Sequence, residues 1–163
     1  MTSKCYFRFW LAAALIVSPF ASQDACAQWT YVGQPGFSPS GAPHVQHTEM
    51  VINEANELYV AFADYGYSPL GAPSGTVMKY TDTGWRTIGN PGFTPGWTNH
   101  CAMALGKGDT VYYAFADGTA TGFSRGRVMR YDGNNWDFLG DVLTVSESKF
   151  TNIEVSSDGT VYF

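Results

Sequence analysis

The chain has 163 residues, with fourteen acidic against nine basic side chains, and it is rich in aromatic residues and glycine. The clustered positive charge of a nucleic-acid-binding surface is absent, so we expect no nucleic-acid partner. The sequence is also poor in long helix-forming runs, which favours short strands and turns.

The first 27 residues have the layout of a secretory signal peptide. Two basic residues precede an apolar stretch over residues 9–17, and Ala25-Cys26-Ala27 forms a small-x-small cleavage signal ahead of Gln28. A membrane anchor is the alternative, but the apolar stretch is about half of the roughly twenty residues that a span needs. The residues before Cys26 do not resemble a lipobox. We therefore expect a secreted or periplasmic mature chain that begins near Gln28 and has no membrane span.

Removal of this segment leaves Cys101 as the one cysteine of the mature chain. An intramolecular disulfide is then impossible, although export normally permits disulfides. The folded state must therefore be stabilised by the burial of apolar side chains. Because Cys101 lies in an apolar run and has only the adjacent His100 near it in sequence, we expect a buried, inert thiol.

A hexapeptide that occurs twice organises the mature chain. Residues 59–64 are Tyr-Val-Ala-Phe-Ala-Asp, residues 112–117 are Tyr-Tyr-Ala-Phe-Ala-Asp, and the opening of the motif returns at 161–163. A Val-Met-Lys/Arg-Tyr motif follows each of the first two copies, and Trp29, Trp85 and Trp136 each open a short motif that ends in glycine. A period of about fifty residues with several short apolar runs indicates a repeat architecture.

Each repeat is predicted to contain four short strands. The first strand covers residues 47–52, 100–105 and 150–155, the hexapeptide is the second, the Val-Met motif the third and the Trp motif the fourth. Tight polar turns between apolar runs mark hairpins, so the strands pair antiparallel. Alternate residues of a strand point to opposite faces of its sheet, and in the hexapeptide both sets of alternate residues are apolar. Both faces of the sheet must therefore be covered. The predicted boundaries are 29–33 for an isolated outer strand, 45–89 and 98–140 for complete repeats, and 150–163 for a partial one.

Radial stacking of four-stranded sheets about an axis gives the β-propeller, which typically has about four to eight blades. The motifs resemble the repeats of secreted bacterial propeller proteins, with the general form Trp-x-x-Val-Gly, then Tyr-Val-Ala-Tyr/Phe-x-Asp, then Val-x-Lys-Tyr-Asp-Gly. The resemblance runs from Trp29 to the last residue. It implies an all-β fold of β-propeller blades of four antiparallel strands, about two and a half in number, and it implies little about activity.

Two and a half blades do not close a ring, and Phe163 aligns with the middle of the hexapeptide. A truncated sequence is therefore the first hypothesis, and assembly of several copies is the alternative. We expect the terminal faces of the stack to lie bare and residues 28–163 alone to aggregate or fold poorly. The bare residues are expected to be Val77, Met78, Tyr80 and the partial blade at 150–163.

Ligand sites sit on loops that a rigid scaffold holds. Strand direction alternates, so the loops before the first strand and between the second and third strands lie on one side, and these are the long aromatic loops. The candidate ligand-binding residues on that face are Phe37, His47, Tyr65, Tyr67, Phe93, Trp97, His100, Phe123 and Arg125.

Two histidines of this set occupy equivalent positions. His47 and His100 start the first strand of successive repeats, near the mouth of the expected axial channel, where converging imidazoles can ligate zinc or copper. The third repeat has Phe150 there. We therefore expect structural or hydrogen-bonding histidines, with no metal and no other cofactor.

Asp64 and Asp117 end the two hexapeptides, and paired carboxylates can do acid–base chemistry. A catalytic residue breaks repeat symmetry, whereas a residue present in every repeat usually caps a turn or accepts backbone N–H bonds. The repeated tryptophans are likewise expected to pack between strands, which leaves the non-repeated Trp97 and Phe123 as better ligand candidates. No catalytic residue is assigned.

The first functional hypothesis is a secreted, non-enzymatic binding or scaffolding module that contacts carbohydrate or extracellular protein through the long-loop face. The alternative is part of a propeller-type extracellular enzyme, a glycosidase or lyase, whose catalytic residues lie in other blades. Either protein needs the remaining blades of the same chain, or other copies, to close a ring.

Overall fold

The computed structural model describes residues 29–42, 44–67, 71–119, 124–144 and 146–163. Residues 31–163 form one compact unit. The expected signal peptide at 1–27 lies outside the described residues and stays a prediction. Among the described residues, no helix has the length and apolar character required to cross a membrane.

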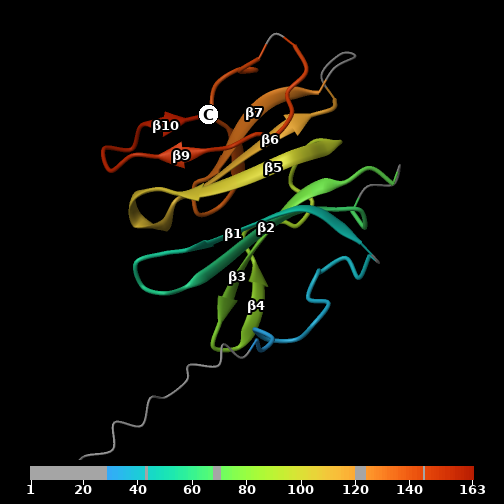
Figure 1. The fold of residues 1–163 in the computed structure, drawn as a ribbon, viewed down its shortest axis with the longest axis vertical. Helices are drawn as coiled ribbons and strands as arrows, with labels where there is room; N and C mark the ends of the chain where they lie inside the picture. The colour runs from blue at the N-terminus through green and yellow to red at the C-terminus, as the bar shows by residue number, and fades with distance from the viewer. Residues whose placement is uncertain (1–28, 43, 68–70, 120–123, 145) are drawn as a thin grey trace, which may run out of the picture. The chain divides into compact units, whose positions relative to one another are not determined.

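Two four-stranded antiparallel sheets make up most of this unit (Figure 1). The first sheet contains β1 (Val45–Ile52), β2 (Leu58–Asp64), β3 (Ser74–Thr81) and β4 (Gly84–Thr87), paired in that order. The second contains β5 (Thr98–Leu105), β6 (Val111–Asp117), β7 (Arg125–Tyr131) and β8 (Trp136–Phe138), with the short 3-10 helix η1 (Lys107–Asp109) after β5. A hairpin of β9 (Glu154–Val155) and β10 (Val161–Tyr162) follows. The all-β class and the antiparallel four-stranded sheets are therefore confirmed.

The two sheets are equivalent in register. Met50 of β1 lies opposite Val60, and Met103 of β5 lies opposite Tyr113. Both first strands contain a bulge at the same place, after Gln46 in β1 and after Asn99 in β5. The sequence repeat is therefore also a repeat of backbone geometry.

The first sheet packs face to face on the second, and the β9–β10 hairpin packs on the other face of the second (Figure 1). The cluster between the sheets includes Tyr59, Ala61 and Val77 from the first and Met103, Val111, Tyr113, Phe115 and Met129 from the second. The cluster on the far side of the second sheet is formed by Ala102, Ala104, Tyr112, Ala114, Val128 and Ile153. Both faces of the second sheet are thus covered, as its apolar hexapeptide predicts.

One glycine makes the close approach of the sheets possible. A Cβ atom on Gly75 of β3 would lie 2.8 Å from Thr94 Cγ2 and 2.9 Å from Tyr113 Cε1. Both neighbours are buried and cannot retreat. A side chain at position 75 would therefore push the first sheet away from the Tyr113 ring.

The prediction that Val77 and Met78 lie bare is wrong, because they are only 1 % and 4 % exposed. Successive strand residues point to opposite faces, and Val77 faces the second sheet. Met78 shares the other face with Phe62, whose ring Phe37 contacts edge-on at 6.2 Å. The exposed residues of that outer face are instead Met50 and Ile52 of β1. In the partial third repeat, the expected exposure is confirmed for Phe150, Tyr162 and Phe163.

Two predicted strands are shorter or absent. The structure assigns no strand to residues 29–33, since no described strand lies beside them to supply hydrogen bonds. Of the strand expected at 150–155, only β9 forms.

Candidate functional site

The bulges in β1 and β5 place two histidines in an uncommon backbone conformation. His47 has φ 52° and His100 has φ 47°, and Phe150 adopts φ 55° at the matching place of the third repeat. The left-handed region is unfavourable for residues with a Cβ atom. Its recurrence with different side chains shows that the repeat backbone requires it, and such a bulge re-aims the side chain it carries.

The bulges bring three rings into a row. The His47 and His100 ring centroids lie 4.8 Å apart with 49° between the planes, and those of His100 and Phe150 lie 5.1 Å apart. Both imidazoles are partly exposed, and neither has a hydrogen-bond partner among the described residues. Burial, and then the neighbouring His100, lower the pKa of His47. The histidines therefore pack against each other, but the predicted hydrogen bonding of their side chains is not found in the part of the chain that the structure describes.

Cys101 follows this row in sequence and is buried. Its thiol donates a hydrogen bond to the backbone carbonyl of His47, with 2.7 Å between sulfur and oxygen. Burial raises the pKa of Cys101 to about 11. Burial also holds the pKa of the enclosed Tyr113 hydroxyl well above its ordinary value. A neutral, enclosed thiol is a poor nucleophile, so the prediction of a buried thiol is confirmed.

Asp64 holds the two long loops of the first sheet. Its carboxylate is fully buried and accepts hydrogen bonds from the hydroxyls of Ser38 at 2.6 Å and Ser40 at 2.5 Å. It also accepts the backbone N–H of Gly66 at 3.0 Å. The serines belong to the loop before β1, and Gly66 belongs to the loop after β2. One carboxylate thus ties both loops together.

Asp117 is the equivalent carboxylate of the second sheet, and it anchors the loop after β6. It is fully buried, accepts the backbone N–H of Thr119 at 2.9 Å and pairs with Nη1 of Arg127 at 3.3 Å. Both aspartates accept the N–H two residues further along the chain. The predicted turn-capping role of the repeated aspartates is therefore confirmed.

The repeated tryptophans link each repeat to the preceding segment. The ring of Trp136 stacks on Phe93, and its indole N–H donates to the carbonyl of Ile88 at 2.9 Å. Trp85 makes the equivalent contacts with Phe37, at 4.2 Å between centroids, and with the Val32 carbonyl, at 3.0 Å. Trp85 also packs on Tyr80 of β3, and Trp136 packs on Tyr131 of β7, each with 5.3 Å between the ring centroids. The prediction that these tryptophans pack between strands is therefore confirmed for Trp85 and Trp136.

Three of the predicted ligand residues lie on the surface of the long loops. Trp97, directly before β5, is 55 % exposed and lies against Gly118. The hydroxyl of Tyr65 donates to the Gln46 side chain at 2.9 Å, and Tyr67 lies against Gly92 in the next repeat. These aromatic side chains come from loops of both sheets.

The other candidates are placed differently. Phe37 and Phe93 each have one ring face against a tryptophan. Arg125 begins β7, and its buried Nε atom has no partner among the described residues. Phe123 lies outside the described residues. Within the described part of the candidate set, the one contact between two rings is that of His47 with His100.

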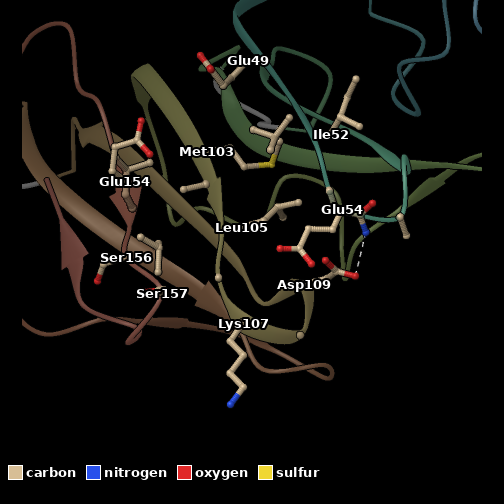
Figure 2. A pocket seen from close by; sticks show the side chains of 18 of the residues that line it. Glu49, Ile52, Glu54, Met103, Leu105, Lys107, Asp109, Glu154, Ser156 and Ser157 are labelled. Atoms are coloured by element: carbon tan, nitrogen blue, oxygen red, sulfur yellow. Dashed lines mark hydrogen bonds between the residues drawn. The ribbon is translucent and has the colours of Figure 1, made fainter.

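A cavity of about 890 Å³ opens at the ends of β1 and β5 that lie opposite the long loops (Figure 2). It is lined by β1, β5 and β9 and by the short turns that follow them. The Asn53 side-chain amide donates to Asp109 at 2.9 Å on one side of it. The side chain of Lys107 points away from the hollow in Figure 2. The carboxylates around the cavity are those of Glu49, Glu54, Asp109 and Glu154.

This cavity was not predicted from the sequence, because each repeat contributes only a short polar turn to it. A signal was nevertheless present. The bulge alignment pairs Glu49 with Ala102, and Glu154 with Ala104 in the second repeat. Glu49 and Glu154 are therefore carboxylates at positions where the second repeat has alanine.

No protein-family model matches this chain, and no curated protein or solved structure is significantly similar to it.

Proposed function

We propose that the chain is part of a secreted β-propeller in which each four-stranded sheet is one blade. A comparison of two equivalent methionines carries the proposal. Met103 of β5 is 4 % exposed because the first sheet covers it, whereas Met50, at the same place in β1, is 62 % exposed. The outer face of the first sheet thus has the apolar residues of a blade interface. A further blade, from the same polypeptide or from another copy, is the cover that fits it.

Within that architecture, the protein is a binding or scaffolding module that contacts carbohydrate or protein at the cell exterior through the long-loop face. Two features support this assignment. Buried Asp64 and Asp117 hold the loops, so ligand groups on them have a rigid support. Trp97 presents a large, partly exposed indole there, and such rings supply contact area to sugars and protein partners.

Substitution of Trp97 tests the proposed ligand face. We expect Trp97→Ala to weaken retention by extracellular polysaccharides or surface proteins about tenfold, a change of about 1.4 kcal/mol. Trp97→Phe should keep part of the affinity, and Lys107→Ala, at the opposite end, should keep all of it. The measurement is affinity electrophoresis in a panel of polysaccharides, together with capture of proteins from the cell surface. Equal retention of the Trp97→Ala and parent chains would contradict the proposal that the long loops form the ligand-binding face.

The propeller-type enzyme is the second candidate, and the asymmetric carboxylates around the cavity favour it. Asp109 and Glu154 come from different repeats and line the same hollow. Pairs of carboxyl groups across a cleft are the catalytic groups of most glycosidases. Release of reducing sugar by the parent chain, lost in both Glu154→Gln and Asp109→Asn, would establish the enzyme and displace the binding module.

A further inference from the structure

We propose that His47 and His100 together bind one divalent transition-metal ion, with Cu²⁺ as the preferred ion. Imidazole is a good ligand for copper, nickel and zinc, and copper binds most tightly among first-row divalent ions at a given nitrogen site. The proposal concerns two residues on the described strands and holds whether or not the chain is part of a propeller.

The separation of the rings fits a shared ion. A metal about 2.0–2.1 Å from one nitrogen of each imidazole, with an N–metal–N angle of about 90° to 109°, places the ring centroids about 4.5 to 5.2 Å apart. The observed centroid distance is 4.8 Å. The planes of the two imidazoles are inclined by 49°.

The ring nitrogens are also free to act as ligands. No described side chain or backbone group hydrogen-bonds to either imidazole, so an ion would displace no protein contact. Both rings are partly exposed, which gives an ion access from solvent.

The backbone holds the side chains of His47 and His100 beside each other. Each histidine sits at the left-handed residue of a bulge, and the bond from the Cys101 thiol to the His47 carbonyl links the two bulges directly. The two ligands are therefore held by paired strands of packed sheets instead of by mobile loops. Phe150 occupies the third place in the row, so the protein supplies two nitrogens and water or an external ligand completes the coordination.

The chain offers matched variants for the test. Phe is the native residue at the equivalent position 150, where φ is also positive, so His47→Phe and His100→Phe introduce a side chain that this backbone conformation accepts in the third repeat. His44 is the third histidine of the chain; it packs on Tyr65 at 4.4 Å, and His44→Phe is the control.

The experiment uses the full chain without a histidine tag and with Cys5 and Cys26 replaced by Ser, because thiols bind copper and reduce Cu²⁺. Equilibrium dialysis against Cu²⁺ counts bound copper per chain whatever the state of association, and electron paramagnetic resonance reports the nitrogen ligands. We expect one copper per chain with two imidazole nitrogens. Each single variant at 47 or 100 should lose affinity by at least about tenfold, and the double variant should lose the site, while His44→Phe binds like the parent chain. Circular dichroism of the variants establishes that the sheets are intact.

Two results would overturn the proposal. One is copper binding by the folded double variant that equals that of the parent chain. The other is a spectrum with fewer than two imidazole nitrogens, which would leave His47 and His100 as packed rings only.

Discussion

The ring of Trp136 lies flat on the ring of Phe93, with 3.9 Å between the centroids and 6° between the planes. The contact joins the last strand of the second sheet to the loop that follows the first sheet. Phe93 also meets Tyr113 edge-on at 5.0 Å, in the centre of the cluster between the sheets. A side chain expected at a ligand face is thus also part of the packing that holds two repeats together.

Truncation of Phe93 should therefore destabilise the stack. Removal of a large aromatic side chain from a packed site costs about 3 kcal/mol or more in the free energy of unfolding. We expect a loss of about 2 to 3 kcal/mol for Phe93→Ala, since Phe93 is partly exposed. Denaturant unfolding followed by tryptophan fluorescence measures it, with both substitutions made in the Met50→Lys background to limit association through the exposed face of the first sheet. Trp97→Ala, with its more exposed ring, is the control and should change stability by less than about 0.5 kcal/mol. Equal effects of the two substitutions would contradict the assigned role of Phe93.

The thiol of Cys101 should be inert until the sheets separate. Its pKa of about 11 leaves little thiolate at about pH 8, and the residue is only 8 % exposed. In a Met50→Lys chain with Cys5 and Cys26 replaced by Ser, which limits association through the exposed sheet face, we expect reaction with a disulfide reagent to be slow. The reaction should accelerate with denaturant in step with unfolding. Rapid labelling of the folded chain would show that the region between the two sheets is open to solvent.

Much of the local architecture could be predicted from the sequence. The hexapeptides at 59–64 and 112–117 are apolar on both faces, and the structure buries both faces of β6. The recurrence of Asp64 and Asp117 marked them as turn-capping residues, because a residue needed by every repeat serves the common backbone. Repetition was informative wherever the same side chain makes the same contact.

The left-handed backbone at the start of each repeat had no sequence signal. His47, His100 and Phe150 adopt it, and none of these is the glycine that such a backbone normally favours. The error at Val77 and Met78 has a different cause. Neighbouring strand residues face opposite ways, so one sheet face could not expose both. The contacts between the rings and the shape of the cavity depend on packing between repeats. The pattern within a single strand marks some of the residues but does not contain that packing.

The signal-peptide hypothesis predicts the mature terminus. Processing after Ala27 by a bacterial secretion host should yield a product that begins at or near Gln28. Mass spectrometry of the exported protein measures this terminus directly. A soluble cytosolic product that retains Met1 would count against export.

The exposed outer face of the first sheet makes a final prediction about residues 28–163 in isolation. Met50 and Ile52 are 62 % and 58 % exposed at this end of the stack, and Tyr162 is 60 % exposed in the last hairpin. Covering this face with another blade would contribute roughly 25 cal/mol for each Å² of apolar surface buried, and the isolated residues lack that contribution. We therefore expect aggregation or poor folding.

Two lysine substitutions separate surface association from a general failure to fold. Met50→Lys places a charge on the exposed face and should reduce association while it preserves the sheets. Met103→Lys buries the charge at the equivalent position and should unfold the chain. Size-exclusion chromatography with light scattering, followed by thermal unfolding, distinguishes these results. A discrete closed oligomer of the parent chain would show that other copies pack on the exposed face. A cooperative monomer that forms only after addition of further repeats would show that the same polypeptide supplies the blade for this face. A monodisperse, cooperatively melting monomer of residues 28–163, with Met50→Lys no different from it, would contradict the view that this face requires another blade.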